Sequence, residues 1–417
     1  MTDFRTSLKD AELFRGLNDA ALREITTAAA TRCIAKDRVL FNQGDLPNHL
    51  FLVGQGKFKV ASLGKDGSQR TLRFMGPGEI MGCAAVFNHF PYPATATATV
   101  ESVVLKSSGR ETLSAAGNRL ELYDDEPVDF DAWDVDPFHL ETRRDASPAD
   151  GWHVVSAGPL RGEIAFDRRL GSASTMRQIV RLDAGSRRLE FHTTVDWRES
   201  HTLLKVCFPL GVRAMNATYE TPFGYAERPT HFSTSFDRAR FEVPGHRFAD
   251  LSEHGFGAAV LTDSKYGYSC YGSELRVSLL RAPKSPDAEA DMGRHEFAYA
   301  LLPHTGGWRE AGVLREAICF NAPFRWTHDA PTASFASVED PNVVLDTVKR
   351  AERSDALVLR LYEAHGGRGV ARVRLASSVH EARLANALED ELGEITVQDG
   401  GLALPYLPHQ VLTVIVR

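Results

Sequence analysis

The chain has 417 residues, of which 43% are hydrophobic and 25% charged, and its formal net charge is −7. This length suits two or three domains with separate cores, and the acidic balance argues against a general nucleic-acid binder, which needs clustered Lys and Arg. No apolar run approaches the ~20 residues of a membrane span and the amino terminus lacks a signal-peptide core, so we expect a cytoplasmic protein.

The first predicted element is a short amphipathic helix over residues 19–32. The pattern then changes to short β-type runs separated by glycine turns, such as RVLFNQGD and HLFLVGQGKFKVAS. These runs predict a compact β-roll, so that residues 1–107 form the first domain. Small polar residues over 108–117 predict a linker.

Residues 118–417 read as strand after strand, with turns such as DSKYGYS and KSPDAEAD between the runs. The runs include RLEFHTTVDW, TLLKVCFPLGV, FGAAVLTD, ELRVSLLR, HEFAYALLPH, ALVLRLYEA, GVARVRLA and QVLTVIVR. Their spacing predicts a large β-sandwich over 118–330, and a compositional break predicts a smaller β-domain over 331–417. The predicted fold class is therefore mainly β: a small jelly-roll-like β-roll with a flanking helix, then a large sandwich and a terminal β-domain.

The loop GEIMGCAAVFNHFPYPATATA, residues 78–98, has the build of a phosphate cradle, because a Gly-Glu pair leads into small residues with free amides. With the V-G-Q-G-K turn before it, this loop makes residues 13–107 resemble the effector domain of the Crp/Fnr regulators and other cyclic-nucleotide-binding proteins. The resemblance implies a Glu for the ribose and an Arg for the cyclic phosphate. In this sequence their positions hold Cys83 and Pro93, so both polar anchors are replaced.

The predicted effector-binding residues are therefore those that remain in the loop: Gly78, Glu79, Gly82, Cys83, Ala84 and Thr95. Three interpretations stay open, namely a purely structural roll, a cyclic-nucleotide sensor, and a site for another small effector or a partner. The dimer helix and helix-turn-helix of the regulators do not follow the roll, so no DNA-reading element is predicted.

Five blocks carry a second resemblance, among them NRLELYDDEPVDFDAWDVD, RLEFHTTVDWRESHTLLKVCFPL and LLRAPKSPDAEADMGRHEFAYALLPHTGGW. They make residues 118–417 look like the carboxy-terminal β-domains of α-mannosidases of glycoside hydrolase family 38. The resemblance implies a retaining zinc enzyme whose Asp nucleophile and zinc ligands lie in an amino-terminal domain. The β-roll occupies that place, and the sequence has neither a His-x-Asp pair nor an H-E-x-x-H motif. We therefore predict no catalytic residue and no metal site, and expect zinc only in the missing catalytic domain.

The remaining polar residues fit structural roles. Histidines in strand-like runs are interpreted as surface or hydrogen-bonded core residues: His192, His201, His295 and His304. Five cysteines without a C-x-x-C pair predict reduced, mainly structural thiols. The acids of DFDAWDVD suit turns and solvated edges better than catalysis.

Sugar contact is the remaining function, because aromatic rings stack on pyranoses and polar side chains bond their hydroxyls. The predicted contact residues are Trp133, Tyr219, Arg228 and His231. The leading hypothesis is an α-mannosidase-like region that binds carbohydrate or a partner and is inactive alone. The alternatives are a component that complements a separate mannosidase catalytic chain, a small-ligand sensor, and a rearranged or truncated mannosidase gene product. The expected partners are a mannoside or other carbohydrate, and a separate catalytic domain or a second copy of the chain. We expect no binding to nucleic acid or to a membrane.

Overall fold

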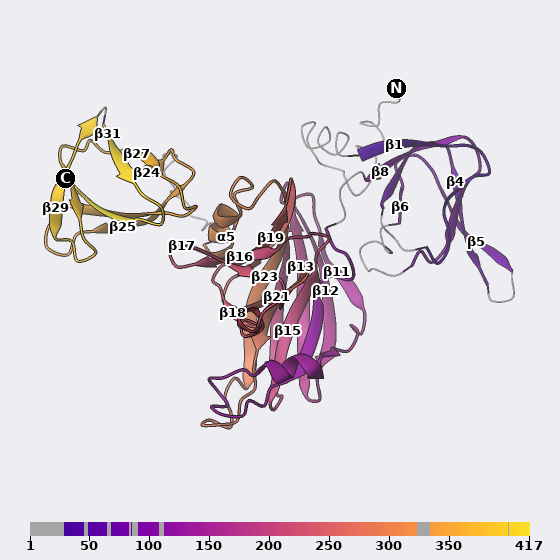
Figure 1. Cartoon of the computed structure of the whole chain (residues 1–417). Helices are drawn as coiled ribbons and strands as arrows, with labels where there is room; N and C mark the ends of the chain where they lie inside the picture. The colour runs from indigo at the N-terminus through magenta and orange to yellow at the C-terminus, as the bar shows by residue number, and fades with distance from the viewer. Residues whose placement is uncertain are drawn as a thin grey trace. The chain divides into compact units, whose positions relative to one another are not determined.

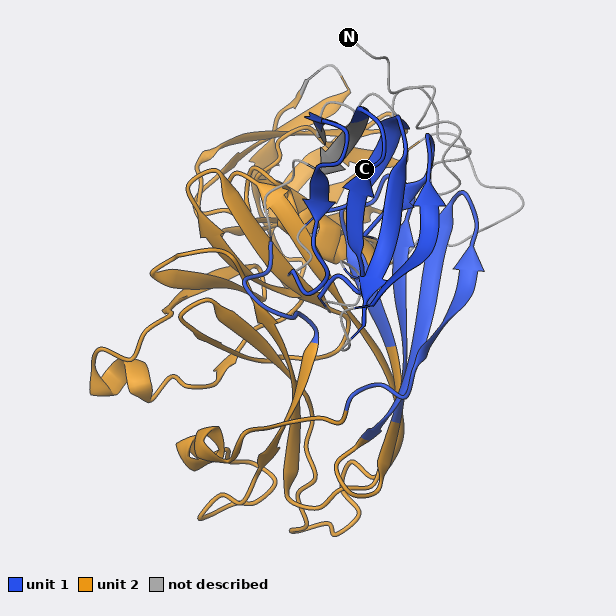
Figure 2. Cartoon of the chain, turned by 90° about the vertical axis from the view of Figure 1, so that its right-hand side faces the viewer, with its two compact units in different colours: residues 1–118, 148–169, 176–192 blue, residues 119–147, 170–175, 193–417 orange. Residues whose placement is uncertain are grey.

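The computed structural model describes residues 29–45, 49–64, 68–82, 85, 91–107, 112–322, 334–398 and 400–417. Strands make up 52% of the structure and helices 6%, so the prediction of a mainly-β chain is confirmed. The chain forms two compact units, residues 1–118, 148–169 and 176–192 in the first and residues 119–147, 170–175 and 193–417 in the second (Figure 2). None of the helices in the described ranges has the length and apolar character needed to cross a membrane.

Residues 29–107 form a β-roll of two antiparallel four-stranded sheets, ordered β1-β8-β3-β6 and β2-β7-β4-β5 (Figure 1). Apolar side chains from both sheets, including Phe41 and Phe58, form one core. The helix predicted over 19–32 is wrong at its end, because residues 29–32 belong to β1 and pair with β8, and its earlier residues lie outside the described part. The strands are β1 (Ala29–Ile34), β2 (Val39–Phe41), β3 (Phe51–Gln55), β4 (Phe58–Leu63), β5 (Gln69–Met75), β6 (Ile80–Met81), β7 (Thr95–Ala98) and β8 (Ser102–Ser107).

Two larger sheets follow, a six-stranded one ordered β10-β9-β15-β22-β21-β18 and a nine-stranded one ordered β11-β12-β13-β14-β23-β20-β19-β16-β17. The short helices of this region are the 3-10 helix η2 (Pro137–Thr142), α4 (Ser235–Arg238) and α5 (Val313–Asn321). The strands are β9 (Arg119–Asp124), β10 (Arg144–Asp145), β11 (Trp152–Ala157), β12 (Arg161–Leu170), β13 (Ser174–Asp183), β14 (Leu189–Trp197), β15 (Thr202–Pro209), β16 (Asn216–Thr221), β17 (Gly224–Pro229), β18 (Val243–Pro244), β19 (Phe248–Glu253), β20 (Phe256–Thr262), β21 (Gly267–Tyr271), β22 (Glu274–Leu280) and β23 (Gly293–Thr305).

Strand β15 shows why the six-stranded sheet has one apolar and one polar face. Successive side chains of a strand point to opposite faces, so Leu204 and Val206 lie on one face and Lys205 on the other. Lys205 is opposite Glu121 of β9 and Ser278 of β22. Although β15 is buried along its whole length, the face that carries Lys205 also carries Glu121 and Ser278 from the two neighbouring strands.

Residues 334–417 form two further sheets, ordered β24-β27-β31-β30 and β25-β26-β32-β28-β29. Their core includes Leu359, Val373 and Val414, while Tyr362 packs in a separate cluster with Trp308 and α5. The strands are β24 (Ala336–Val338), β25 (Val343–Arg350), β26 (Leu357–Glu363), β27 (Gly369–Leu375), β28 (Ala382–Ala385), β29 (Glu391–Ile395), β30 (Val397–Gln398), β31 (Gly401–Tyr406) and β32 (Val411–Val416).

All eight runs that predict strands within residues 118–417 coincide with strands, namely β14, β15, β20, β22, β23, β26, β27 and β32. In β14 the inward side chains alternate with more exposed ones, which is the pattern that the prediction used. The boundaries expected between the domains stay predictions.

Candidate functional site

A buried carboxylate, Glu121 of β9, organises the polar face of the six-stranded sheet. It accepts hydrogen bonds from Arg119 Nε (2.8 Å), Arg276 Nε (2.8 Å), Arg143 Nη1 (3.0 Å) and the Tyr123 hydroxyl (2.6 Å). Burial alone would raise the pKa of Glu121, but the hydrogen bond and charge of Arg276 outweigh it and hold the pKa at about 2. The carboxylate is therefore ionised at neutral pH and fixes three arginines.

Lys205 is the second buried charge on this face. Its side chain is fully buried, and its ammonium pairs with Glu242 and lies 5.5 Å from the centroid of the Tyr123 ring. Burial, reinforced by the charge of Arg276, lowers the pKa of Lys205 to about 7. Burial and the Lys205 charge also lower the pKa of His139 to about 4, and its Nε2 lies 3.6 Å from Glu242 Oε1. The His139 ring is thus neutral at pH 7.

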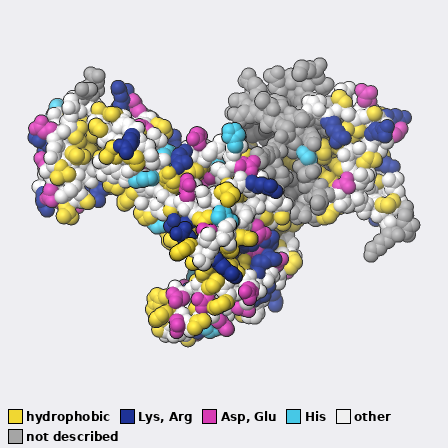
Figure 3. Space-filling view, in the orientation of Figure 1, with side chains coloured by type: hydrophobic (Ala, Val, Ile, Leu, Met, Phe, Trp, Pro, Cys, Tyr) yellow, Lys and Arg dark blue, Asp and Glu magenta, His cyan; other side chains and the backbone are white. Residues whose placement is uncertain are grey.

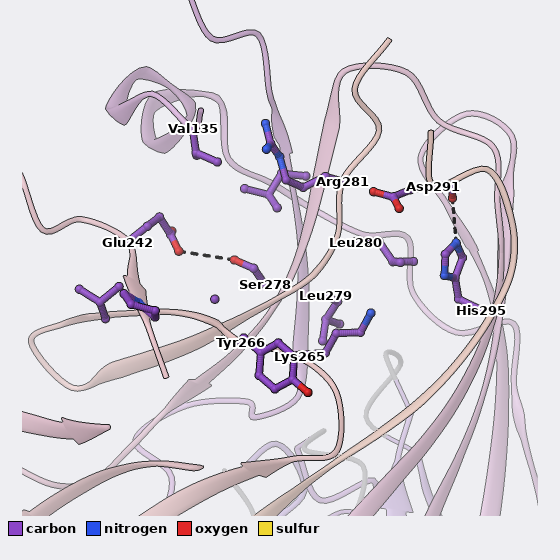
Figure 4. A pocket seen from close by; sticks show the side chains of 14 residues that line it. Val135, Glu242, Lys265, Tyr266, Ser278, Leu279, Leu280, Arg281, Asp291 and His295 are labelled. Atoms are coloured by element: carbon purple, nitrogen blue, oxygen red, sulfur yellow. Dashed lines mark hydrogen bonds between the residues drawn. The ribbon is translucent and has the colours of Figure 1, made fainter. Parts of the chain in front are cut away.

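Glu242 lines a pocket of about 550 Å³, a volume ordinary for a small-molecule site (Figure 4). The carboxylate accepts a long hydrogen bond (3.5 Å) from Ser278 Oγ, and on another wall His295 Nε2 lies 2.8 Å from the Asp291 carbonyl oxygen. The lining also includes apolar side chains, among them Val135, Leu203, Val243, Leu279 and Leu280, and the guanidinium of Arg281. The pocket therefore combines apolar side chains with polar and charged groups.

Three polar groups of this pocket keep their hydrogen-bonding capacity free. Within the described ranges, Lys265 Nζ, the Tyr266 hydroxyl and the Asp291 carboxylate make no hydrogen bond. Lys265 Nζ lies 4.5 Å from the centroid of the Phe297 ring, and Tyr266 is 55% exposed. Burial lowers the pKa of Lys265, although the charges of Asp263 and Asp291 oppose this shift. The pocket thus offers a donor, an acceptor and an aromatic ring to a bound molecule.

The predicted effector loop is described only in part, because Cys83 and Ala84 lie outside the described residues. Gly78 and Gly82 have φ values of 85° and 88°, a left-handed backbone that favours glycine. A Cβ on Gly82 would lie 3.2 Å from the ring of Tyr92, which is 3% exposed. The Tyr92 ring therefore packs closely against this glycine.

The other two predicted effector residues, Glu79 and Thr95, are engaged within the β-roll. Glu79 accepts a hydrogen bond from Gly76 N (2.6 Å) and pairs with Arg73. Thr95 Oγ1 accepts one from Gln43 N (2.9 Å). Both side chains support turns of the roll, which favours the structural interpretation over effector binding.

Three of the four predicted sugar-contact residues lie on or beside the paired strands β16 and β17, and none of the four lines the pocket. Trp133 is 69% exposed in the connection between β9 and η2. Tyr219 of β16 is 1% exposed and packs edge-to-face on Tyr268, so the prediction for Tyr219 is corrected: its ring belongs to the core. Arg228 and His231 are half-buried at the end of β17, the outermost strand of the nine-stranded sheet.

The described residues do not supply a zinc site, since no group of three His, Cys, Asp or Glu side chains among them is placed to hold a metal ion. His304, for example, is buried with its Nε2 2.7 Å from Asp250 Oδ2, as expected of a hydrogen-bonded core residue. Cys207 and Cys270 are unpaired and buried, and burial raises the pKa of each thiol to about 12. Both thiols are therefore protonated at neutral pH, whereas Cys33 and Cys319 are exposed.

Sequence reasoning missed the residues that line the pocket. Lys265 and Tyr266 lie in DSKYGYS and Asp291 in KSPDAEAD, two segments that the sequence presents only as turns. A charged and an aromatic residue side by side in a turn between buried strands is the signal that would have singled out the first pair. Glu242 carries no such signal, because its partner Lys205 lies far away in the sequence.

Three family models match the chain. The cyclic nucleotide-binding domain matches residues 31–116, the glycosyl hydrolases family 38 C-terminal domain matches 94–289, and the family 38 C-terminal beta sandwich domain matches 342–414. Both resemblances found in the sequence are confirmed.

Curated relatives agree with the family models. Alpha-mannosidase 2C1 of Homo sapiens is 48% identical over 332 residues, which cover 76% of this chain and 32% of that protein. Alpha-mannosidase G of Dictyostelium discoideum is 41% identical over 286 residues, covering 64% and 26%. The cyclic AMP receptor protein of Thermus thermophilus is 32% identical over 115 residues, covering 28% and 53%. The chain therefore spans about a third or less of the length of these mannosidases.

A solved structure supports the fold. The alpha-mannosidase from Enterococcus faecalis V583 aligns with a TM-score of 0.58 at 13% identity. The alignment covers 93% of this chain and 54% of that one. At this identity the match establishes a shared fold.

Proposed function

Because the chain carries a cyclic nucleotide-binding domain and the C-terminal domains of glycosyl hydrolase family 38, we propose that it is a carbohydrate-binding protein related to the α-mannosidases. The pocket of about 550 Å³ is the observation that carries this proposal. A neutral polyol fits its polar groups, since each hydroxyl both donates and accepts. The pocket carries two acidic residues, Asp291 and Glu242, and two basic ones, Lys265 and Arg281, so its charge favours neither an anion nor a cation.

This chain binds the sugar and does not itself hydrolyse glycosides. The described residues do not supply zinc ligands, and the sequence has no His-x-Asp pair. The pocket residues therefore bind and orient a sugar, and the β-roll serves as a structural or docking module in a cytoplasmic protein.

A second candidate function is to complement a separately encoded mannosidase catalytic chain. The observation that favours it is the match to the C-terminal domains of glycosyl hydrolase family 38. Co-purification with such a chain, with mannosidase activity present only in the mixture, supports this function. Full activity of the catalytic chain alone contradicts it.

We expect Tyr266→Ala to weaken the binding of methyl α-mannoside about 2- to 10-fold, because an aromatic contact contributes about 0.5–1.5 kcal/mol. Isothermal titration calorimetry on the full chain measures the change. Tyr271→Ala is the matched control, since Tyr271 is 57% exposed and does not line the pocket. An affinity that falls equally in both variants, or in neither, contradicts the placement of the sugar.

A further inference from the structure

The segment 128–140, here called the platform, exposes large apolar side chains. Val128 is 79% exposed, Phe130 68%, Trp133 69% and Phe138 62%. Exposed apolar residues scattered singly need no explanation, but several in one short segment mark an interaction surface. Trp133, which was predicted to contact a sugar, is therefore one member of a group of exposed apolar side chains.

The backbone of the platform is fixed by Arg281, which follows β22. Its guanidinium donates to the carbonyl oxygens of residues 131 (3.1 Å), 132 (3.3 Å) and 134 (2.7 Å). Its Nε also donates to the buried carboxylate of Asp125 at 2.6 Å. The apolar side chains are therefore presented by an anchored backbone, which lowers the entropy lost when a partner binds.

Asp131 and Phe130 add to this anchoring. The Asp131 carboxylate accepts hydrogen bonds from Lys284 N (2.7 Å) and Ser285 N (2.9 Å). Phe130 has a φ of 56°, and the left-handed region is an outlier for an aromatic residue and costs about 1–2 kcal/mol. Its carbonyl oxygen accepts a hydrogen bond from Trp133 N at 2.7 Å. The fold holds Phe130 in a strained conformation while leaving its ring outside the core, as is typical of functional segments.

Acidic residues predominate in and beside the platform. Residues 120–142 contain neither Lys nor Arg and nine Asp and Glu, namely Glu121, Asp124, Asp125, Glu126, Asp129, Asp131, Asp134, Asp136 and Glu141. Two of these acids are paired with basic residues from outside this range, Asp125 with Arg281 and Asp124 with Arg144. Five of these acids, Asp124, Glu126, Asp129, Asp134 and Glu141, are exposed. Figure 3 shows hydrophobic and acidic side chains intermixed at the lower end of the molecule in that view. The platform is thus an apolar patch with an anionic border.

We infer that the platform docks a protein partner whose contact surface is apolar and bordered by Arg and Lys. Opposite potentials across an interface favour association and suppress wrong partners. A second copy paired through the same platform would set these acidic borders against each other. A single pyranose ring stacks on an aromatic side chain or two, whereas the platform presents four large apolar side chains.

Three labelled peptides test this inference by fluorescence anisotropy with the full chain. The first is an amphipathic Leu/Lys helix, the second a Leu/Glu helix with the same apolar positions, and the third a Ser/Lys peptide with the same charges. We expect the Leu/Lys peptide to bind at least about 10-fold more tightly than either of the others. Its binding weakens at high salt, because exposed charges are screened.

The variant Phe130→Ser/Trp133→Ser should weaken binding of the Leu/Lys peptide about 10-fold or more. The matched control is Leu388→Ser/Leu392→Ser, which removes apolar side chains that are 73% and 66% exposed elsewhere. Tyr266→Ala, which tests the sugar pocket, leaves peptide binding unchanged.

Four results would overturn the inference. They are the absence of binding by every peptide, equal binding of the Leu/Glu peptide, equal loss in both double variants, and a homodimer in analytical ultracentrifugation that Phe130→Ser/Trp133→Ser abolishes. A fifth result also overturns it: loss of methyl α-mannoside binding in the same variant, with peptide binding intact, assigns the platform to sugar.

Discussion

Glu121→Gln is expected to lower the free energy of unfolding of the family 38 region by about 3–5 kcal/mol, the usual cost of removing one partner from a buried charge network. The change leaves Arg119, Arg143 and Arg276 without the carboxylate that accepts their hydrogen bonds. Urea unfolding followed by tryptophan fluorescence measures the effect, because all five tryptophans lie beyond residue 118.

The same variant should change the response to acid. The pKa of Glu121 in the fold, about 2, lies below its ordinary value of 4.5, so its stabilisation is complete above pH 4.5 and is lost as the pH falls through about 2. Glu121→Gln removes this part of the pH dependence. Glu296→Gln is the control, since Glu296 and its partner Arg294 are 65% and 72% exposed, and it should change stability by less than about 1 kcal/mol. Equal stability of the two variants contradicts the role of Glu121.

Glu363→Gln should destabilise the carboxy-terminal sheets by about 2–4 kcal/mol, since hydrogen bonds to a charged group contribute about 1.5–3 kcal/mol each and a Gln amide keeps part of them. The buried carboxylate accepts four backbone N–H groups, from His365 (2.9 Å), Gly366 (2.9 Å), Gly367 (2.8 Å) and His409 (2.8 Å). A Gln places an amide NH₂ against some of these donors. Burial would raise the pKa of Glu363, but these N–H groups lower it, so the carboxylate is the form that the fold selects.

Thermal unfolding of the full chain, with hydrogen exchange of the turn amides, measures this loss. Glu339→Gln provides the control, because Glu339 is 44% exposed and pairs with Arg374 at the surface. Unaltered protection of the Gly366 and Gly367 amides in Glu363→Gln would show that the carboxylate does not hold the turn.

The strands were predictable from the sequence because their inward positions are apolar at a period of two. The start of β1, residues 29–32, was not, since a run rich in alanine and threonine has no strong period, and the pairing of β1 with β8 decides its conformation. Lys205 illustrates a second limit. A lysine in the apolar run TLLKVCFP reveals a break in the pattern, but its partner Glu242 is set by tertiary contact.

The candidate ligand-binding residues were harder to predict than the strands. Trp133 and Tyr219 are both aromatic, yet one is 69% and the other 1% exposed, because Tyr219 lies in β16 between two paired strands and Trp133 in a connection. The pocket is lined by residues from several separate segments between residues 135 and 295. Two of its charged residues, Lys265 and Asp291, belong to different turns. Such a site depends on how distant turns meet, which local patterns do not contain.

Saturation-transfer NMR of p-nitrophenyl α-mannoside with the full chain, in the presence of zinc, tests the central claim of sugar binding without hydrolysis. We predict transfer of saturation from the protein to the sugar protons, and a mannoside spectrum that stays unchanged with no free mannose. Release of mannose that a chelator abolishes, or the absence of any saturation transfer, would contradict the claim.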